Sequence, residues 1–499
     1  MLQIKKWLID NIAKESTSLK RAAAIQLVSR YSSVIIGLGS QLILARILTP
    51  NDYGILAVMM VFTAFFSMLS DFGMSGAIVQ NRELNDEDII SIYAWTFRMA
   101  LVLAIGFAII SYPMSLFYGD DIYQKLGCIL AISIFFNALN MVPAALLMKR
   151  KQFLLIGLRQ ITTTIICAAI TIFLAWLGIG VYALVASSVI NAMLNYIWNI
   201  SGSGLTFSWK VNGKSVKKIR KFSLNVLGFN FMNYFARNMD NLLIGKAFGT
   251  IELGNYNRAY QLMVYPLGMF TSIVTPALLP FIAEHQHDKE YVYKKFLATV
   301  KLLSLIGIYI SVFSFFCARE LVIILFGNQW EGAVSCFQYL SMSIWAQMIC
   351  STSGAMFEAI GRADLMFQRG MFTTLGTISC IVVGISTGSL AITSLLVSIS
   401  YFSNFVLMLY YLVGEGLHAN IIDFIRQLIP DGIIVVLLAL ELYVICQMEY
   451  LSIVCACCVK LVGSFLLYVF LMIKLRQLKF LLPVCPVKFR NWLKKLEEI

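Results

Sequence analysis

The segment Gln41-Leu-Ile-Leu-Ala-Arg-Ile-Leu-Thr-Pro-Asn-Asp-Tyr-Gly54 returns without gaps as Asn241-Leu-Leu-Ile-Gly-Lys-Ala-Phe-Gly-Thr-Ile-Glu-Leu-Gly254, at an offset of 200 residues. Two further matches follow in the same order. Leu116 to Asp120 matches Ile324 to Asn328 at an offset of 208, and Arg150 to Phe153 matches Arg362 to Leu365 at 212. Apolar helices resemble one another by chance, but three matches in order, with a slowly growing offset, indicate an internal repeat.

The composition is that of a membrane protein. The 499 residues are 59% hydrophobic and 13% charged, with a mean hydropathy of +0.80, whereas a soluble domain carries roughly 25% charge. A bilayer-spanning helix needs about 20 mostly apolar residues. The sequence predicts fourteen such helices, at residues 22–48, 55–80, 90–113, 122–148, 154–177, 180–200, 222–248, 257–283, 296–317, 332–358, 366–387, 389–413, 430–447 and 450–473.

The basic residues predict the orientation. With the N-terminus in the cytoplasm, about 29 of the 39 Lys and Arg residues fall inside, about 5 outside and about 5 within spans. Both termini are then cytoplasmic, and the even number of spans satisfies the positive-inside rule at nearly every link. The net charge of +13 therefore reflects membrane topology, and we expect no nucleic-acid partner.

Each copy of the repeat contains six spans, so both copies enter the membrane from the same side, and transporters with such parallel repeats bind substrate between them. The predicted class is an all-α polytopic membrane protein with two six-helix lobes and two C-terminal helices. The predicted divisions are an amphipathic cytoplasmic segment at 1–21, the first lobe at 22–200, a basic cytoplasmic linker at 201–221, the second lobe at 222–413, helices 13 and 14 at 414–473, and a basic cytoplasmic tail at 474–499.

The first span of each copy carries a polar stripe with a cation. In span 7 the stripe is Asn230, Tyr234, Arg237 and Asn241, with Asn233 and Asp240 beside it; in span 1 it is Gln26, Arg30, Ser33, Gly37 and Gln41. Polar residues inside spans face a bundle interior or a water-filled cavity. One reading is a hydrogen-bonded seam in which Arg237 and Asp240, spaced i and i+3, neutralise each other. Because a polar stripe with a cation lies in the first span of both copies, we favour the other reading, a solvated cavity.

Further polar residues within spans are candidates for the same cavity or for ion coupling. Arg98 in span 3 is a cavity candidate, and Asp71, Asp240 and Glu358 are carboxylates placed to titrate in an ion-coupled cycle. Lys460 in span 14 is expected to snorkel to the membrane surface or to pair with Glu441.

Signals of enzyme chemistry are missing from the sequence. It contains no Walker A sequence, no His-Glu-x-x-His and no nucleophile elbow. Cys455, Cys457 and Cys458 lie in a span without a His or carboxylate partner and do not predict a metal site. We expect no catalytic residue, no metal and no cofactor.

Several motifs resemble those of a known family. They are Leu44 to Gly54, Ser70-Asp-Phe-Gly-Met74, Asp240-Asn-Leu-Leu-Ile-Gly245, Leu253-Gly-Asn-Tyr-Asn-Arg-Ala-Tyr260 and Leu325-Phe-Gly-Asn-Gln-Trp330. In this order and spacing they are similar to those of Wzx-like polysaccharide transporters of the multidrug/oligosaccharidyl-lipid/polysaccharide flippase superfamily, in the colanic-acid and teichuronic-acid exporter branch. The resemblance covers nearly the whole chain, best between about residues 20 and 415.

The resemblance implies two lobes around a central cavity that opens alternately to either side of the bacterial cytoplasmic membrane. It also implies the cargo, a lipid-linked oligosaccharide on undecaprenyl pyrophosphate for a surface polysaccharide such as O-antigen, capsule or exopolysaccharide. Polymerases and glycosyltransferases of the same pathway are the implied partners. A pyrophosphate needs cations in a low-dielectric cavity, and Arg30 and Arg237 are placed to supply them. The coupling ion stays open, because no ion site of the family matches residue by residue.

Two alternatives remain. A cation-coupled multidrug or metabolite exporter of the same superfamily would require an acidic, aromatic cavity, whereas the stripes here are basic and rich in amides. A membrane-embedded polysaccharide polymerase or ligase would require a sizeable outer loop with polar catalytic residues, and the predicted outer links are short.

Overall fold

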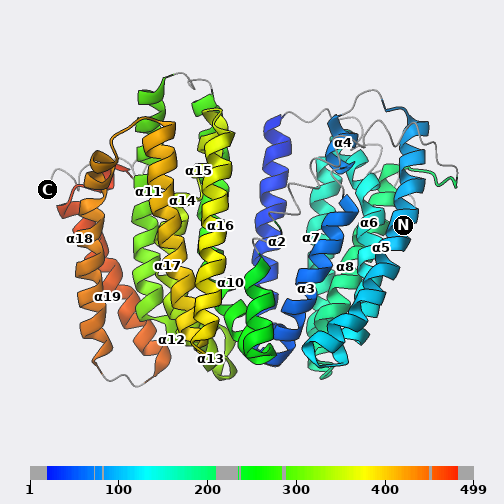
Figure 1. Ribbon diagram of the computed structural model, residues 1–499, viewed down its shortest axis with the longest axis horizontal. Helices are drawn as coiled ribbons and strands as arrows, with labels where there is room; N and C mark the ends of the chain where they lie inside the picture. The colour runs from blue at the N-terminus through cyan, green and yellow to red at the C-terminus, as the bar shows by residue number, and fades with distance from the viewer. Residues whose placement is uncertain are drawn as a thin grey trace. The chain divides into compact units, whose positions relative to one another are not determined.

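The computed structural model describes residues 19–71, 74–80, 84–209, 234, 238–283, 288–448 and 452–480. Within these ranges every regular element is a helix (Figure 1). The all-α class predicted from the sequence is therefore confirmed. The chain divides into two compact units, Met1–Leu242 and Leu243–Ile499.

The first unit is built from long apolar helices with clear end signals. Asn85 starts α5 with a capping box, in which its side chain accepts from the Asp88 amide and the Asp88 side chain accepts from the Asn85 amide. Gly119 ends the same helix at φ 75°, a left-handed conformation that suits glycine. The helices are α2 (Leu19–Ile47), α3 (Pro50–Asp71), α4 (Met74–Gln80), α5 (Asp86–Tyr118), α6 (Ile122–Lys149), α7 (Phe153–Trp176) and α8 (Val181–Ser203), and residues 238–242 are also helical.

Inside this unit α5, α6 and α8 pack together, while α2 lies along α7. The buried residues Ile92, Leu139 and Val142 belong to the core between the first three helices. A Cβ on Gly157 of α7 would lie 2.4 Å from Ser29 Oγ and 3.1 Å from Ile25 of α2. This close contact places the start of α7 at the level of the first half of α2.

The second unit contains the remaining helices. They are α10 (Thr250–Ala283), α11 (Lys289–Phe316), α12 (Ala318–Phe326), α13 (Glu331–Ser341), α14 (Ile344–Cys350), α15 (Ser353–Ala359), α16 (Ala363–Ser386), α17 (Leu390–Met408), α18 (Ile421–Cys446) and α19 (Ile453–Lys474). A π-helical turn, Leu409–Gly416, extends α17, and 3-10 turns lie at Asn328–Trp330 and Leu478–Phe480. In Figure 1, α18 and α19 lie beside α11 at one edge of this unit.

The predicted span 332–358 is an interrupted helix. It consists of α13, α14 and α15, with breaks at residues 342–343 and 351–352. Ser311 of α11 donates to the carbonyls of Ser341 (2.7 Å) and Met342 (3.0 Å) at the first break. The uninterrupted helix expected there was wrong. A neighbouring helix bonds the carbonyls at the first break, whereas at the second break the hydroxyls of Ser351, Thr352 and Ser353 bond the carbonyls of their own span.

Eleven helices in the described part of the chain are long and apolar enough to cross a membrane. The predicted span 222–248 lies mostly outside the described residues, so the count of fourteen stays a prediction. The start predicted for span 13, at residue 430, was wrong because α18 begins at Ile421. Asn420 caps α18 through the Ile422 amide, and the charged first turns are helical although too polar to lie in lipid.

Candidate functional site

The polar stripe of span 7 is only partly described. Asn230, Asn233 and Arg237 lie outside the described residues, whereas Tyr234, Asp240 and Asn241 are half-buried in the first unit. Asp240 Oδ1 accepts from the Asn241 amide at 2.8 Å. The predicted pairing of Arg237 with Asp240 therefore stays a prediction.

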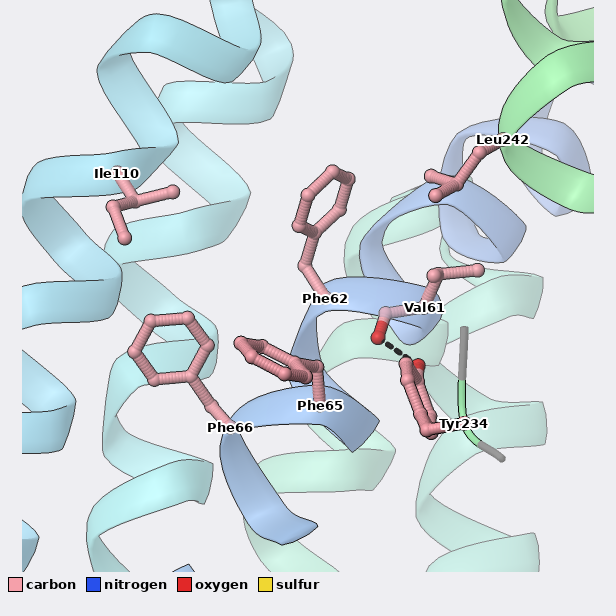
Figure 2. Close-up of a pocket in the computed structure, with 7 residues that line it drawn as sticks. All are labelled: Val61, Phe62, Phe65, Phe66, Ile110, Tyr234 and Leu242. Atoms are coloured by element: carbon pink, nitrogen blue, oxygen red, sulfur yellow. Dashed lines mark hydrogen bonds between the residues drawn. The ribbon is translucent and has the colours of Figure 1, made fainter. Parts of the chain in front are cut away.

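Tyr234 reaches into an apolar pocket of about 150 Å³ (Figure 2). Its hydroxyl donates to the carbonyl of Val61 in α3, and its ring centroid lies 5.9 Å from that of Phe65. The other lining residues are Phe62, Phe66, Ile110 and Leu242. These contacts anchor Tyr234 against α3. Apart from the bonded hydroxyl of Tyr234, the described lining residues present no polar side chain to a sugar.

The stripe of span 1 lies along α2. Arg30 is exposed, and within the described chain Ser33 Oγ and Gln41 Oε1 are buried atoms without a hydrogen-bond partner. No atom lies within 4 Å of the position that a Cβ on Gly37 would occupy. Buried polar atoms are normally satisfied, so Ser33 and Gln41 are available to bind water or a ligand.

Arg159 of α7 adds a second cation at the level of Arg30. It stands two residues after Gly157, which contacts Ser29 of α2, and two residues of helix rise only about 3 Å. Arg159 is half-buried, and its Nε has no hydrogen-bond partner in the described chain. No acidic side chain of the described residues forms a salt bridge with it.

Arg369 of α16 is a buried cation in the second unit, with 9% of its surface exposed. Its Nε and Nη2 donate to Asn404 Oδ1 of α17 at 3.1 and 2.8 Å, and its Nη1 donates to Ser353 Oγ of α15. Every hydrogen-bond partner of Arg369 in the described chain is neutral. Its charge is therefore uncompensated there, although its N–H groups are bonded.

Arg159 and Arg369 lie at the same depth in two helices, one in each unit, although the repeat offset of 212 aligns Arg159 with Met371. Each stands six residues after the start of its helix, since α7 begins at Phe153 and α16 begins at Ala363. Sequence reasoning missed both residues as site candidates. A basic residue near a predicted cytoplasmic helix end is usually topogenic, and only the helix starts and the burial in the structure distinguish these two. The repeat would not have found them either, because its offset of 212 aligns Arg159 with Met371.

The other predicted site residues have different surroundings. Arg98 of α5 is exposed and donates to the carbonyl of Trp209 at 3.0 Å, and Glu358 is exposed in the last turn of α15. Asp71 ends α3, and its side chain lies outside the described part of the structure. The pairing expected for Lys460 was wrong, because Lys460 pairs with Glu320 of α12 at 2.5 Å instead of with Glu441.

Each of the two arginines, Arg159 and Arg369, is suited to bind an anion. Guanidinium groups bonded to neutral amides and hydroxyls can exchange those partners for phosphate oxygens without breaking an ion pair, and their planar fork matches a phosphate. A buried cation without a counter-charge also lowers the cost of bringing an anion out of water.

The known proteins similar to this chain are polysaccharide biosynthesis and transport proteins. A family model described as polysaccharide biosynthesis protein matches residues 43–335. The lipopolysaccharide biosynthesis protein WzxC of Escherichia coli (strain K12) is 25% identical over 70% of this chain and 72% of its own length. The succinoglycan biosynthesis transport protein ExoT of Rhizobium meliloti (strain 1021) is 23% identical over 70% of each chain.

Solved structures show the same fold at low sequence identity. The lipid II flippase MurJ, in an inward closed conformation, aligns with a TM-score of 0.70 at 15% identity, over 90% of this chain and 98% of its own. A multidrug resistance MATE family transporter of the MOP superfamily aligns with a TM-score of 0.58 at 14% identity, over 80% of this chain and 95% of its own.

Proposed function

Because this chain belongs to the polysaccharide biosynthesis protein family, whose model matches residues 43–335, we propose that it is a flippase for lipid-linked oligosaccharides. It moves repeat units of a surface polysaccharide, carried on a polyprenyl pyrophosphate, from the cytoplasmic to the outer leaflet by alternating access. Both termini lie in the cytoplasm, and the two repeats form the lobes that alternate.

The observation that carries the proposal is that Arg159 and Arg369, neither of which has an ionic partner among the described residues, lie at the same depth in their helices. Each lies about 9 Å from the start of its helix, since six residues rise about 1.5 Å each, and that start is the predicted cytoplasmic end. A substrate that enters from the cytoplasmic leaflet brings its pyrophosphate to this depth. Arg30 and Arg237 are proposed to bind the same group, and the amides of Asn230, Asn233 and Asn241 are proposed to bind sugar hydroxyls.

An exporter of cationic drugs fits the charges less well. The buried acids Asp431 and Glu320 are each paired with a lysine, at exposed fractions of 1% and 11% for the two carboxylate side chains. Among the described residues, Arg369 is buried without an ionic partner, and Glu441 of α18 is a half-buried carboxylate without one. The buried arginine favours an anionic substrate.

Expression of this chain in a bacterium that lacks its own flippase for lipid-linked repeat units tests the proposal. We expect export of a polysaccharide with a related repeat unit to return, measured as polymer on the cell surface, because the pyrophosphate end is common to such substrates. Accumulation of the lipid-linked repeat unit in the inner leaflet, despite normal amounts of this chain in the membrane, would contradict the proposal.

Topology is tested by labelling single cysteines in intact cells. We expect cysteines placed at Pro50 and Asn328 to react with a membrane-impermeant maleimide, and cysteines placed within 201–221 to react only after the cells are opened. The reason is the excess of Lys and Arg in the 201–221 link. Labelling of the 201–221 link in intact cells would refute the model of parallel repeats.

A further inference from the structure

The second unit contains a fully buried ion pair in the middle of its helices. Lys301 Nζ of α11 contacts Asp431 Oδ1 of α18, and both side chains are 1% exposed. Lys301 stands twelve residues into α11 and Asp431 ten residues into α18, which corresponds to depths of about 18 and 15 Å. Replacing such a pair with neutral groups often costs nothing in stability, so stability alone does not explain it.

Hydrogen bonds extend from this pair to the interrupted span. Asp431 Oδ2 accepts from Ser304 Oγ at 2.5 Å, and Ser304 Oγ accepts from Trp345 Nε1 at 2.8 Å. Trp345 belongs to α14, the middle piece between the two breaks. A chain of hydrogen bonds therefore connects Asp431 through Ser304 to α14, the piece of the span that has a break on either side.

A cavity of about 500 Å³ borders the carboxylate. It lies between α11, α14, α17 and α18, and it also reaches the first break at Met342. Apart from Asp431, its described lining residues carry no ionisable group; they include Phe315, Phe402 and Ser311. The cavity is large enough to hold water, which Asp431 and Ser311 can bond.

The site can take a proton but not a metal ion. The ammonium of Lys301 already occupies one carboxylate oxygen and repels a second cation. Hard metal ions take about six oxygen ligands, and Asp431 has only the Ser304 hydroxyl and the Gln427 carbonyl nearby, the latter accepting from Lys301 at 2.8 Å. Among the described residues, Tyr468 of α19 is a further titratable group beside the pair, and it donates to the Leu305 carbonyl at 2.9 Å.

We propose that Asp431 is a proton-binding site that couples transport to the proton gradient. Protonation converts the carboxylate into a neutral acid, breaks its ionic bond to Lys301, and gives Ser304 a donor where it had an acceptor. The uncompensated ammonium then favours an arrangement of α11, α14 and α18 in which it is hydrated. The coupling to transport rests on the proposed function, whereas the proton site does not.

Infrared difference spectroscopy of the full chain in lipid bilayers tests the site without any substrate. Between about pH 8 and about pH 5, the wild-type protein should gain the C=O band of a protonated buried carboxyl group. The band should disappear in Asp431→Asn, and also in Asp431→Asn combined with Lys301→Met, which avoids an unpaired ammonium. A wild-type spectrum without the band, or a band unchanged in both variants, overturns the proposal.

The pair formed by Glu320 and Lys460 provides a matched control. It is also buried, at 11% and 6% exposed, but it joins α12 to α19 and has no hydrogen bond to α14 in the described chain. Glu320→Gln should keep the infrared band. In cells, export by the wild type and by Glu320→Gln with Lys460→Met should fall when a protonophore collapses the gradient. Export by Asp431→Asn with Lys301→Met should no longer respond, and a wild-type response in that variant overturns the coupling.

The two proposals fail in different ways. If the infrared band behaves as expected but no variant exports lipid-linked saccharide, the proton site is supported and the proposed substrate is rejected. If saccharide export occurs but the band is missing, the flippase is supported and the proton site is rejected.

Discussion

Alanine at Arg369 should reduce export of lipid-linked saccharide by roughly tenfold or more. A hydrogen bond to a charged group contributes about 1.5–3 kcal/mol, and each 1.4 kcal/mol is a factor of about ten in rate. Arg159→Ala in the first unit should have a similar effect because Arg159 lies at the same depth in its helix. The measurement is polysaccharide on the cell surface, normalised to the amount of the variant in the membrane.

The contacts of Arg369 make this variant a fair test of function. Asn404 Oδ1 keeps a hydrogen bond from Thr373 Oγ1 at 2.9 Å when the arginine is removed, so we expect the protein to accumulate. Arg369→Lys keeps the charge but loses the planar fork, and it should export at an intermediate level.

Arg362 supplies the matched control at the start of the same helix. It pairs with Asp364 at 2.8 Å on the exposed surface, where an ion pair contributes about 0–1 kcal/mol. Arg362→Ala should therefore export normally. Equal losses in Arg362→Ala and Arg369→Ala, or normal export by both Arg159→Ala and Arg369→Ala, would exclude the two buried arginines as the phosphate-binding groups.

Valine at Gly384 should prevent the protein from accumulating in a folded form. A Cβ at this position of α16 would lie 2.7 Å from the Cα of Thr393 in α17, and Thr393 is fully buried. Backbone atoms cannot move aside cheaply, so we expect a cost of about 3 kcal/mol or more, roughly a hundredfold change in the folding equilibrium. The measurement is the monodisperse peak of detergent-solubilised protein in size-exclusion chromatography.

The same substitution at Gly376 is the control for Gly384. Gly376 lies on the same helix, and no atom comes within 4 Å of the position of its Cβ. Gly376→Val should give a normal peak. A normal peak for Gly384→Val as well would mean that α16 and α17 do not approach as closely as the structure places them.

Some features of the site could be read from the sequence, whereas others could not. The polar stripe of α2 was predicted from its period, and the structure adds that Ser33 and Gln41 keep unsatisfied polar atoms. Arg159 was missed because a single cation near a helix end has the same appearance whether it lies in lipid headgroups or against another helix. The α2 residue Ser29, which contacts Gly157 two residues before Arg159, is more than a hundred residues away in the chain.

The sequence alone determined the helical class and most of the spans, because a bilayer offers no water to backbone groups and therefore requires long apolar helices. The repeat stays a prediction. Only the tertiary structure decided which charges meet. Lys301 and Asp431 are separated by 130 residues and Lys460 and Glu320 by 140, and nothing local in the sequence selects one partner over another. The first break in residues 331–359 was also hidden, since a side chain of another helix, Ser311 of α11, bonds its carbonyls. The choice of ion-pair partners and the break in this span depend on how the helices pack, which short-range sequence patterns do not encode.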